Sequence, residues 1–406
     1  MSAARALLGR YPAVRRLFGA RLQSELGSGA AWVALVLVAH ERLHSPWAIS
    51  IVLLSEFLPG VVLAPALGAL ADRHGRRRVA VWADIVSGAS FLGMAMTSSF
   101  EVTVALALVN GTAVAAFNPA LNAALPSLVD EADRPSVMSL AGLAKNVGST
   151  GGAALCALFL PLIGTGGVLA LDGATFLAQA VVIGRVPFGA TPPSTDQPKP
   201  GWRVELGEGW RALAGSHLRW LSLAVIGCVA FGAVTNVGEP LLATQTLHAS
   251  GSLFALMVLA QGIGTVVAAL HCTARRSLDT IRRHCLVGMC GLGLTLAVYG
   301  LAPTGAAALL PFAAMGIVMV LILQSQRALM VATLPDEVLG RAFGIFQAGF
   351  NLAFLVGMLG AGVMFSGLGV RATFLAIAVA AGALAAATLV ALRASRLAPV
   401  AEPSAA

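Results

Sequence analysis

The chain has 406 residues, of which 58% are hydrophobic and only 11% are charged. This composition excludes an ordinary soluble protein, because too few polar residues are present to cover the surface of a chain of this length. The formal net charge is +8, so the placement of the basic residues decides whether they indicate a nucleic-acid partner or a membrane topology.

Apolar runs long enough to cross a bilayer, about 20 residues each, recur along the whole chain. They are rich in Ala, Leu, Val and Gly and do not alternate strictly, which favours helices over outer-membrane strands. The predicted fold class is therefore an all-α polytopic membrane protein with twelve transmembrane helices. These helices are expected at residues 16–39, 46–70, 79–98, 102–127, 136–161, 166–185, 219–243, 251–271, 285–302, 306–329, 342–367 and 370–393.

A polar segment divides these runs into two groups of six. Residues 186–204 are rich in Pro, Ser, Thr and Gly, and VDEADRPSVMSLAG in the first half resembles PDEVLGRAFGIFQAG in the second. Such a duplication predicts two pseudo-symmetric six-helix halves, a common plan of secondary transporters. We expect an N-terminal half at 1–185, a cytoplasmic linker at 186–218, and a C-terminal half with a short cytoplasmic tail at 219–406.

The basic residues predict the orientation of the chain. Nearly all of them lie in, or at the ends of, alternate loops that share one side, whereas the opposite loops carry only Arg42 and Arg371. By the positive-inside rule this side, with both termini, faces the cytoplasm. The excess of basic residues is therefore explained by the membrane topology and does not indicate a nucleic-acid partner. The preference for Arg over Lys and the abundance of Ala suggest a GC-rich bacterial genome, so a multi-pass protein of the bacterial plasma (inner) membrane is expected.

The loop between the second and third runs reads GALADRHGRRRV, from Gly68 to Val79. It resembles the loop signature of the major facilitator superfamily. Two further segments, FNPALNAALPSLV and LPDEVLGRAFG, are similar to segments of the drug:proton antiporter group that includes macrolide efflux pumps and enterobactin exporters. The resemblance covers essentially the whole chain. It implies a secondary active transporter that exports a hydrophobic or amphipathic small molecule (a drug, antibiotic or siderophore) by proton-driven alternating access.

The resemblance also implies a conformational latch in this loop. Asp72 is expected to complement the N-terminal dipole of the eleventh helix and so tie the two halves together. Gly68 permits close helix approach, Gly75 suits a tight turn, and the arginines lie at the anionic inner leaflet. The alternative is a basic loop that only anchors the chain. The latch residues are Gly68, Asp72, Arg73, Gly75, Arg76, Gly340 and Arg341.

Charged residues inside the spans are the candidates for proton coupling or substrate binding, because burying an unpaired charge in a membrane is costly. Glu25 has Arg21 four residues earlier. It is expected either to form an ion pair within its helix or to act as a carboxylate that couples protons or binds the substrate. Glu56 lies three residues before Pro59 and has no basic partner in its helix. It is expected either to carry the proton or to make a hydrogen bond between helices.

The remaining charges have less specific interpretations. Asp84 and Lys145 lie at similar depth, so they either pair or line the cavity. Arg327 either meets an acidic substrate or extends to the cytoplasmic surface. Asp172 and Glu239 are nearer to helix ends and are expected at the interface.

Aromatic and amide side chains complete the candidate cavity. Trp32 and Phe117 suit stacking on an apolar substrate, with ordinary helix packing as the alternative, and Asn118 and Asn146 belong to the same candidate set. The antiporter pattern is incomplete, because Ala107 occupies a position where many drug:proton antiporters carry arginine. The glycine motif of the fifth helix is also partial, with Gly148 and Gly152 present. The resemblance therefore bears on transport more directly than on its energy source.

No other chemistry is indicated. A Walker loop and a nucleophile–base constellation are both missing, so we expect no enzyme and no cofactor. Paired His and Cys at 271–272 and 284–285 flank one loop, but adjacent ligands give awkward geometry, so no metal is expected. The expected partners are a small-molecule substrate, protons and the lipid bilayer, and the protein is expected to be a monomer. The alternatives are an importer of a small polar solute with the same fold, or a membrane receptor or scaffold that does not transport.

Overall fold

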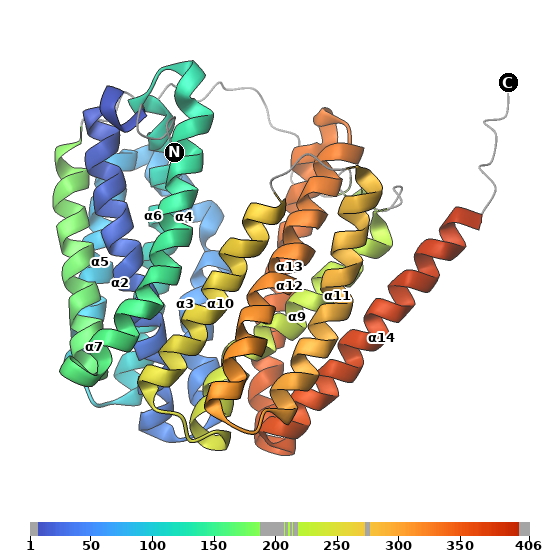
Figure 1. Cartoon of the computed structure of the whole chain (residues 1–406). Helices are drawn as coiled ribbons and strands as arrows, with labels where there is room; N and C mark the ends of the chain where they lie inside the picture. Colours follow the sequence, from blue (N-terminus) through green and yellow to red (C-terminus); the bar gives the residue numbers. More distant parts are fainter. Residues whose placement is uncertain are drawn as a thin grey trace, which may run out of the picture. The chain divides into compact units, whose positions relative to one another are not determined.

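The computed structural model describes residues 7–186, 218–272 and 277–397, together with Gly207, Trp210, Arg211 and Leu213. Within these ranges all regular elements are helical (Figure 1). Among the described residues, ten helices are long and apolar enough to cross a membrane, and a shorter apolar helix lies between the first and second of them. The predicted all-helical, polytopic membrane fold is confirmed.

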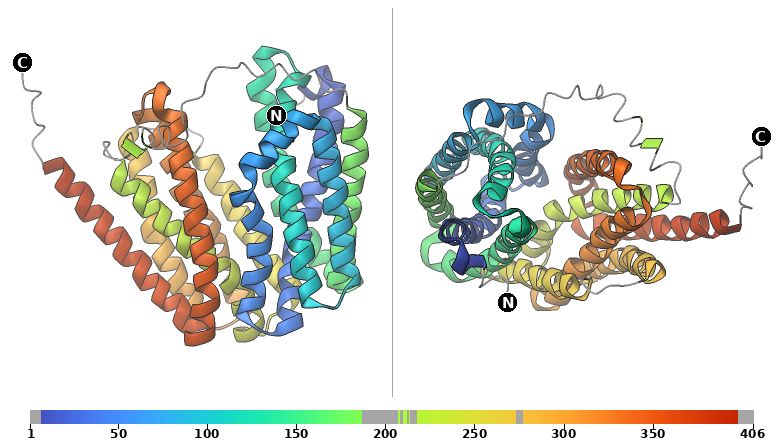
Figure 2. Two further views of the ribbon diagram at one scale, coloured as in Figure 1. Left: turned by 180° about the vertical axis from the view of Figure 1, so that it is seen from behind. Right: turned by 90° about the horizontal axis from the view of Figure 1, so that it is seen from above.

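The first compact unit comprises Met1–Asp196 and Ala243–Gly262. Figure 2 shows its long helices lying side by side as one group. The described helices of this unit are α2 (Pro12–Leu43), α3 (Pro46–Val62), α4 (Ala64–His74), α5 (Arg76–Met96), α6 (Phe100–Ala124), η1 (Leu125–Leu128), η2 (Glu131–Asp133), α7 (Arg134–Arg185) and the first part of α10 (Gly251–Cys272).

The second compact unit comprises Gln197–Leu242 and Ile263–Ala406. The predicted linker falls almost entirely outside the described residues, and the domain boundaries, the pseudo-symmetry and the cytoplasmic termini stay predictions. The remaining described helices are α9 (Arg219–Leu241), η3 (Leu242–Thr246), α11 (Leu278–Leu301), α12 (Gly305–Thr333), α13 (Asp336–Leu368) and α14 (Val370–Leu397).

Two of the predicted spans have breaks that follow from their sequence. α7 covers both the fifth and sixth predicted runs, and Gly164 inside it has φ 67° and ψ 177°, a conformation outside the helical region. Glycine adopts this positive φ without the steric cost that a Cβ would bring. The second predicted run is divided into α3 and α4 at Leu63, and α4 carries a proline in its first turn, where the missing N–H costs no helical hydrogen bond.

α2 and α7 pack closely against each other through glycines. A Cβ added at Gly148 would overlap the side chain of Glu25, and one added at Gly152 would overlap the carbonyl oxygen of Leu26. From the α2 side, a Cβ on Gly29 would lie 2.6 Å from the carbonyl oxygen of Ser149. Small residues let helix backbones approach each other in membranes, so these glycines fix the distance between the two helices on which Glu25 and Lys145 lie.

Candidate functional site

A cavity of about 210 Å³ lies inside the first unit, between α2, α3, α5, α6 and α7. It brings together most of the sequence-predicted candidates, although their helices are far apart in the chain. Its polar lining consists of Arg21, Ser24, Glu25, Ser28, Glu56, Asp84, Ser87, Asn110, Asn118 and Lys145, and its apolar lining of Trp32, Leu35, Phe91, Val114, Phe117 and Phe176.

Arg21 connects three groups of this cavity. Its guanidinium lies 2.6 Å from Glu25 Oε1, so the ion pair within α2 that the sequence allows is present. The same guanidinium donates to Asn118 Oδ1 at 3.3 Å and lies 4.9 Å from the centre of the Phe117 ring, a cation–π distance. The charge of Glu25 is thereby compensated within its own helix.

Glu56 is held differently, by an amide from another helix. Asn110 Nδ2 donates to Glu56 Oε1 at 3.0 Å, so the hydrogen bond between helices that the sequence allows is present. No cation pairs with Glu56 in the part of the chain that the structure describes. A Cβ added at Gly111 would overlap the backbone of Glu56, so the absence of that atom lets α6 come close enough for the amide to reach the carboxylate.

Asp84 has the least compensated carboxylate of the cavity. The residue is 1% exposed, and its Oδ2 atom is buried without a hydrogen-bond partner among the described residues. The pairing of Asp84 with Lys145 that the sequence allows is not formed, and both residues line the cavity instead. Lys145 is exposed on the α7 side of the same space.

Two predicted candidates lie elsewhere. Asn146 is exposed and is not among the lining residues of the cavity, because one step along α7 turns its side chain about 100° away from that of Lys145. Arg327 is exposed on α12 in the second unit. Its role as a substrate contact or a residue extending to the surface stays a prediction.

Asp172 and Glu239, which are expected at the interface, are both buried between helices, and their depth in the membrane stays a prediction. Asp172 is 0% exposed, and its Oδ1 accepts hydrogen bonds from Thr175 Oγ1 at 3.0 Å and from Ser28 Oγ at 3.4 Å. Glu239 is 2% exposed and accepts a hydrogen bond from the Tyr299 hydroxyl at 2.8 Å. Position along a helix gives no information about which face a neighbouring helix covers, and here neighbouring helices cover both carboxylates.

The predicted latch is described only in part. Gly75 has φ 90° in the turn between α4 and α5, as expected for the tight turn. Arg76 Nη1 donates to the carbonyl oxygen of Ala123 at 2.8 Å, at the C-terminal end of α6, where carbonyls lack helical partners. Arg73 and Gly340 are exposed and Arg341 is half-buried. Gly68 and Asp72 lie outside the residues whose side chains are described, and the latch stays a prediction.

Sequence reasoning missed several polar residues of the cavity, of which Asn110 is the most informative. An amide inside the apolar run 102–127 is costly for the same reason as a charge, so the signal was present. Ser24, Ser28 and Ser87 give no comparable signal, because a helical hydroxyl can bond to its own backbone.

The described residues include no group of three or more His, Cys, Asp or Glu arranged to hold a metal ion. The rings of His271 and His284 lie 5.5 Å apart, so the two ends of that loop do come together. The cavity in the first unit therefore remains the candidate site.

A bundle of apolar helices with an inward polar cavity is the architecture of a membrane transporter. The family model of the Major Facilitator Superfamily matches residues 17–238 and 222–406. The chain belongs to this superfamily. Membership confirms the resemblance and establishes the protein as a multi-pass membrane transporter of a small molecule.

Individual members of the superfamily are similar along most of the chain. The enterobactin exporter EntS of Citrobacter koseri is 27% identical over 84% of this chain and 82% of its own. The macrolide efflux protein A of Streptococcus pyogenes is 22% identical over 87% of this chain and 89% of its own. The crystal structure of the nucleoside transporter NupG superposes with a TM-score of 0.75 and 14% identity, covering 94% of this chain and 99% of that one. At this identity the superposition supports the fold alone.

Proposed function

We propose that this transporter exports a hydrophobic or amphipathic small molecule across a bacterial inner membrane in exchange for protons, by alternating access and as a monomer. The similarity to proteins named as exporters of enterobactin and macrolides supports the direction of transport. The proposed energy source and the proposed substrate class are inferred from the cavity of the first unit.

The observation that carries the proposal is the composition of that cavity. Aromatic side chains of Trp32, Phe91, Phe117 and Phe176 share it with carboxylates. Aromatic surface suits an apolar ligand, whereas an uncompensated carboxylate in a region of low dielectric takes up and releases protons as its surroundings change. Both requirements of proton-driven export are therefore present within one space.

Among the carboxylates we assign proton coupling to Glu56. Glu25 is paired with Arg21 at 2.6 Å, so its charge is compensated within α2. Glu56 has the neutral amide of Asn110 as its hydrogen-bond partner among the described residues, and this amide can donate both to a carboxylate and to the carbonyl oxygen of a carboxylic acid. Asp84 lines the same cavity and is the second candidate. Substrate and proton then compete for one site, and exchange further requires that the two conformations bind them with different affinities.

The test uses everted membrane vesicles that are acidified inside and read by a pH-sensitive dye. A panel of antibiotics, dyes and siderophores is added one compound at a time. We expect compound-dependent proton release in the wild type, loss of this release in Glu56→Gln, and retention in Glu101→Gln. The last variant makes the same change at an exposed carboxylate that is not part of the cavity lining.

Different results would reject different parts of the proposal. Proton release that persists in Glu56→Gln but is lost in Asp84→Asn or Glu25→Gln would move the coupling to that residue. If intact cells accumulate a polar solute and no compound of the panel releases protons from the vesicles, an importer would be favoured. Absence of both activities from vesicles that hold their gradient would favour a receptor or scaffold.

A further inference from the structure

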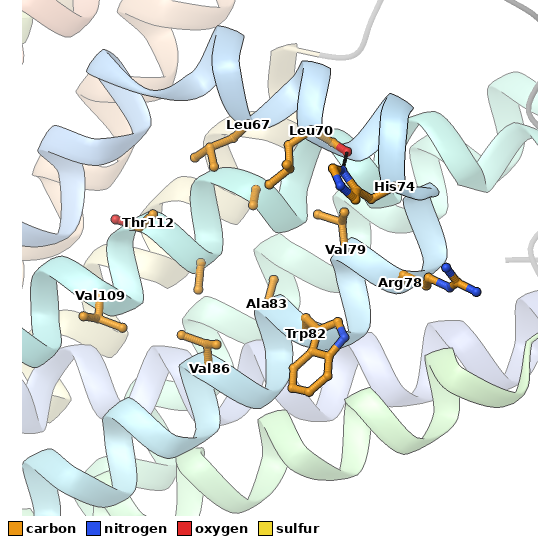
Figure 3. A pocket seen from close by; sticks show the side chains of 12 residues that line it. Leu67, Leu70, His74, Arg78, Val79, Trp82, Ala83, Val86, Val109 and Thr112 are labelled. Atoms are coloured by element: carbon orange, nitrogen blue, oxygen red, sulfur yellow. Dashed lines mark hydrogen bonds between the residues drawn. The ribbon is translucent and has the colours of Figure 1, made fainter.

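A second cavity lies in the first unit and shares no residue with the polar one. It has a volume of about 530 Å³ and opens between α4, α5 and α6. Figure 3 shows the side chains of Leu67, Leu70, Val79, Val86 and Val109 gathered around it. We refer to this space as the apolar groove.

The apolar groove owes its depth to small residues. Ala83, Ala113 and Ala116 lie on its floor and are 6–7% exposed, whereas Trp82 at its edge is 65% exposed. From Arg78 to Val86 the lining follows α5 for roughly 12 Å at 1.5 Å per residue, close to the half-thickness of a bilayer core, about 15 Å. The groove therefore has the length and polarity for a hydrocarbon chain that lies along the helices.

An arginine of the lining and two exposed arginines close to it in the sequence lie toward one end of the apolar groove. Arg78 and His74 belong to its lining and lie together at that end (Figure 3). Arg73, Arg77 and Arg78 are exposed, and in the described part of the chain their side chains form no ion pair or hydrogen bond. His74 Nδ1 contacts the carbonyl oxygen of Leu70 at 3.2 Å, so this end of α4 is fixed. Guanidinium groups bind phosphate well, and none of these three is paired with a carboxylate among the residues whose side chains the structure describes.

We propose that the apolar groove binds an anionic phospholipid, with one acyl chain between α4, α5 and α6 and its phosphate-containing headgroup at Arg78, where the exposed Arg77 adds a second positive charge nearby. Basic residues next to a membrane attract anionic headgroups, and the groove gives the chain a fixed place beside them. The proposal depends on the membrane location of the protein and not on the direction of transport or on protons, so it can fail while the proposed function holds.

Trp82 provides a probe of the apolar groove. The protein is reconstituted into phosphatidylcholine vesicles that contain a small fraction of phosphatidylglycerol brominated on its acyl chains, or the same fraction of brominated phosphatidylcholine. Bromine quenches tryptophan fluorescence at contact, and the difference between wild type and Trp82→Phe isolates the contribution of Trp82. We expect stronger quenching of Trp82 by the brominated phosphatidylglycerol.

The two arginines are tested in the same assay. In Arg77→Gln/Arg78→Gln we expect the preference for phosphatidylglycerol to fall, by about fivefold for each arginine in the lipid fraction needed for half-quenching. Arg15→Gln/Arg16→Gln is the matched control, because it removes two exposed arginines of α2 in the same unit that do not line the groove. This control should retain the preference. Thr112→Leu, which fills the groove from α6, should weaken quenching by the anionic lipid.

Three results would overturn the proposal. Equal quenching of wild type by both lipids would mean ordinary contact with the bilayer. A preference that survives in Arg77→Gln/Arg78→Gln would place the headgroup elsewhere. No quenching of Trp82 by either lipid would mean that protein covers the groove, either another part of this chain or a second copy.

Discussion

At the residue scale, the charges of the cavity differ in how completely they are compensated. Arg21 and Glu25 satisfy each other across one helical turn, Glu56 depends on an amide, and Asp84 keeps a buried oxygen without a partner among the described residues. A carboxylate without a cationic partner changes its protonation more readily with a ligand or a change of conformation than one held in an ion pair. This order of compensation is why coupling is proposed for Glu56 and not for Glu25.

The Arg21–Glu25 pair predicts a non-additive effect on stability. Both side chains are mostly buried, at 16% and 14% exposure. Each single variant, Arg21→Gln or Glu25→Gln, leaves one charge uncompensated, a penalty of about 3 kcal/mol for a buried pair. The double variant removes both charges, so we expect it to melt at a higher temperature than either single variant. The thermal unfolding of purified protein in detergent measures this, and strictly additive losses would show that the two charges do not depend on each other.

Part of the site was predictable from the sequence, because a charged residue within an apolar span is rare and costly. Glu25, Glu56, Asp84 and Lys145 were recognised from the cost of a charge in an apolar span, and all four line one cavity. The partner of Glu56 was not recognised, because Asn110 is 54 residues away and one sequence does not show which helices are neighbours. The burial of Asp172 and Glu239 was missed for the same reason.

At the scale of elements, the contact between α2 and α7 depends on the absence of side chains. We predict that Gly148→Val lowers the amount of folded protein in the membrane, because the new side chain would overlap Glu25 and overpacking costs about 1–3 kcal/mol. Gly142→Val is the control, since no atom lies within 4 Å of a Cβ at that position of the same helix. Membrane abundance and thermal unfolding are compared for both. Similar losses in the two variants would attribute the effect to valine in a helix and not to this contact.

The spans were predictable as apolar runs, but several ends were not. α11 begins at Leu278 and α13 at Asp336, each about two turns before the predicted run. Their first turns carry charged residues such as Asp279 and Asp336, because a helix continues past the apolar core of the bilayer into its polar boundary. The break between α3 and α4 also remained hidden, since the residues around it are apolar and hydropathy does not change there.

At the scale of the whole molecule, transport depends on the balance between two conformations. We predict that Asp72→Asn strongly reduces transport at unchanged membrane abundance, because a carboxylate at a helix N-terminus contributes about 1 kcal/mol, enough to shift such a balance about fivefold. Flux in the everted vesicles, normalised to the amount of protein, measures the effect. Asp72→Glu keeps the charge and should retain more activity. Normal flux in Asp72→Asn would leave the basic loop as an anchor only.

The partners of Glu25 and Glu56 also affect how the protein is inserted into the membrane during synthesis. Arg21 and Glu25 lie in the same helix, so they can neutralise each other as soon as that helix leaves the ribosome and enters the bilayer. Glu56 has to wait for Asn110, a further 54 residues, which takes about 3–10 s at the usual speed of synthesis. During that interval the nascent second helix carries a polar group without its partner. We expect the chain to depend most on the insertion machinery at this stage, after α3 has been made and before α6 follows.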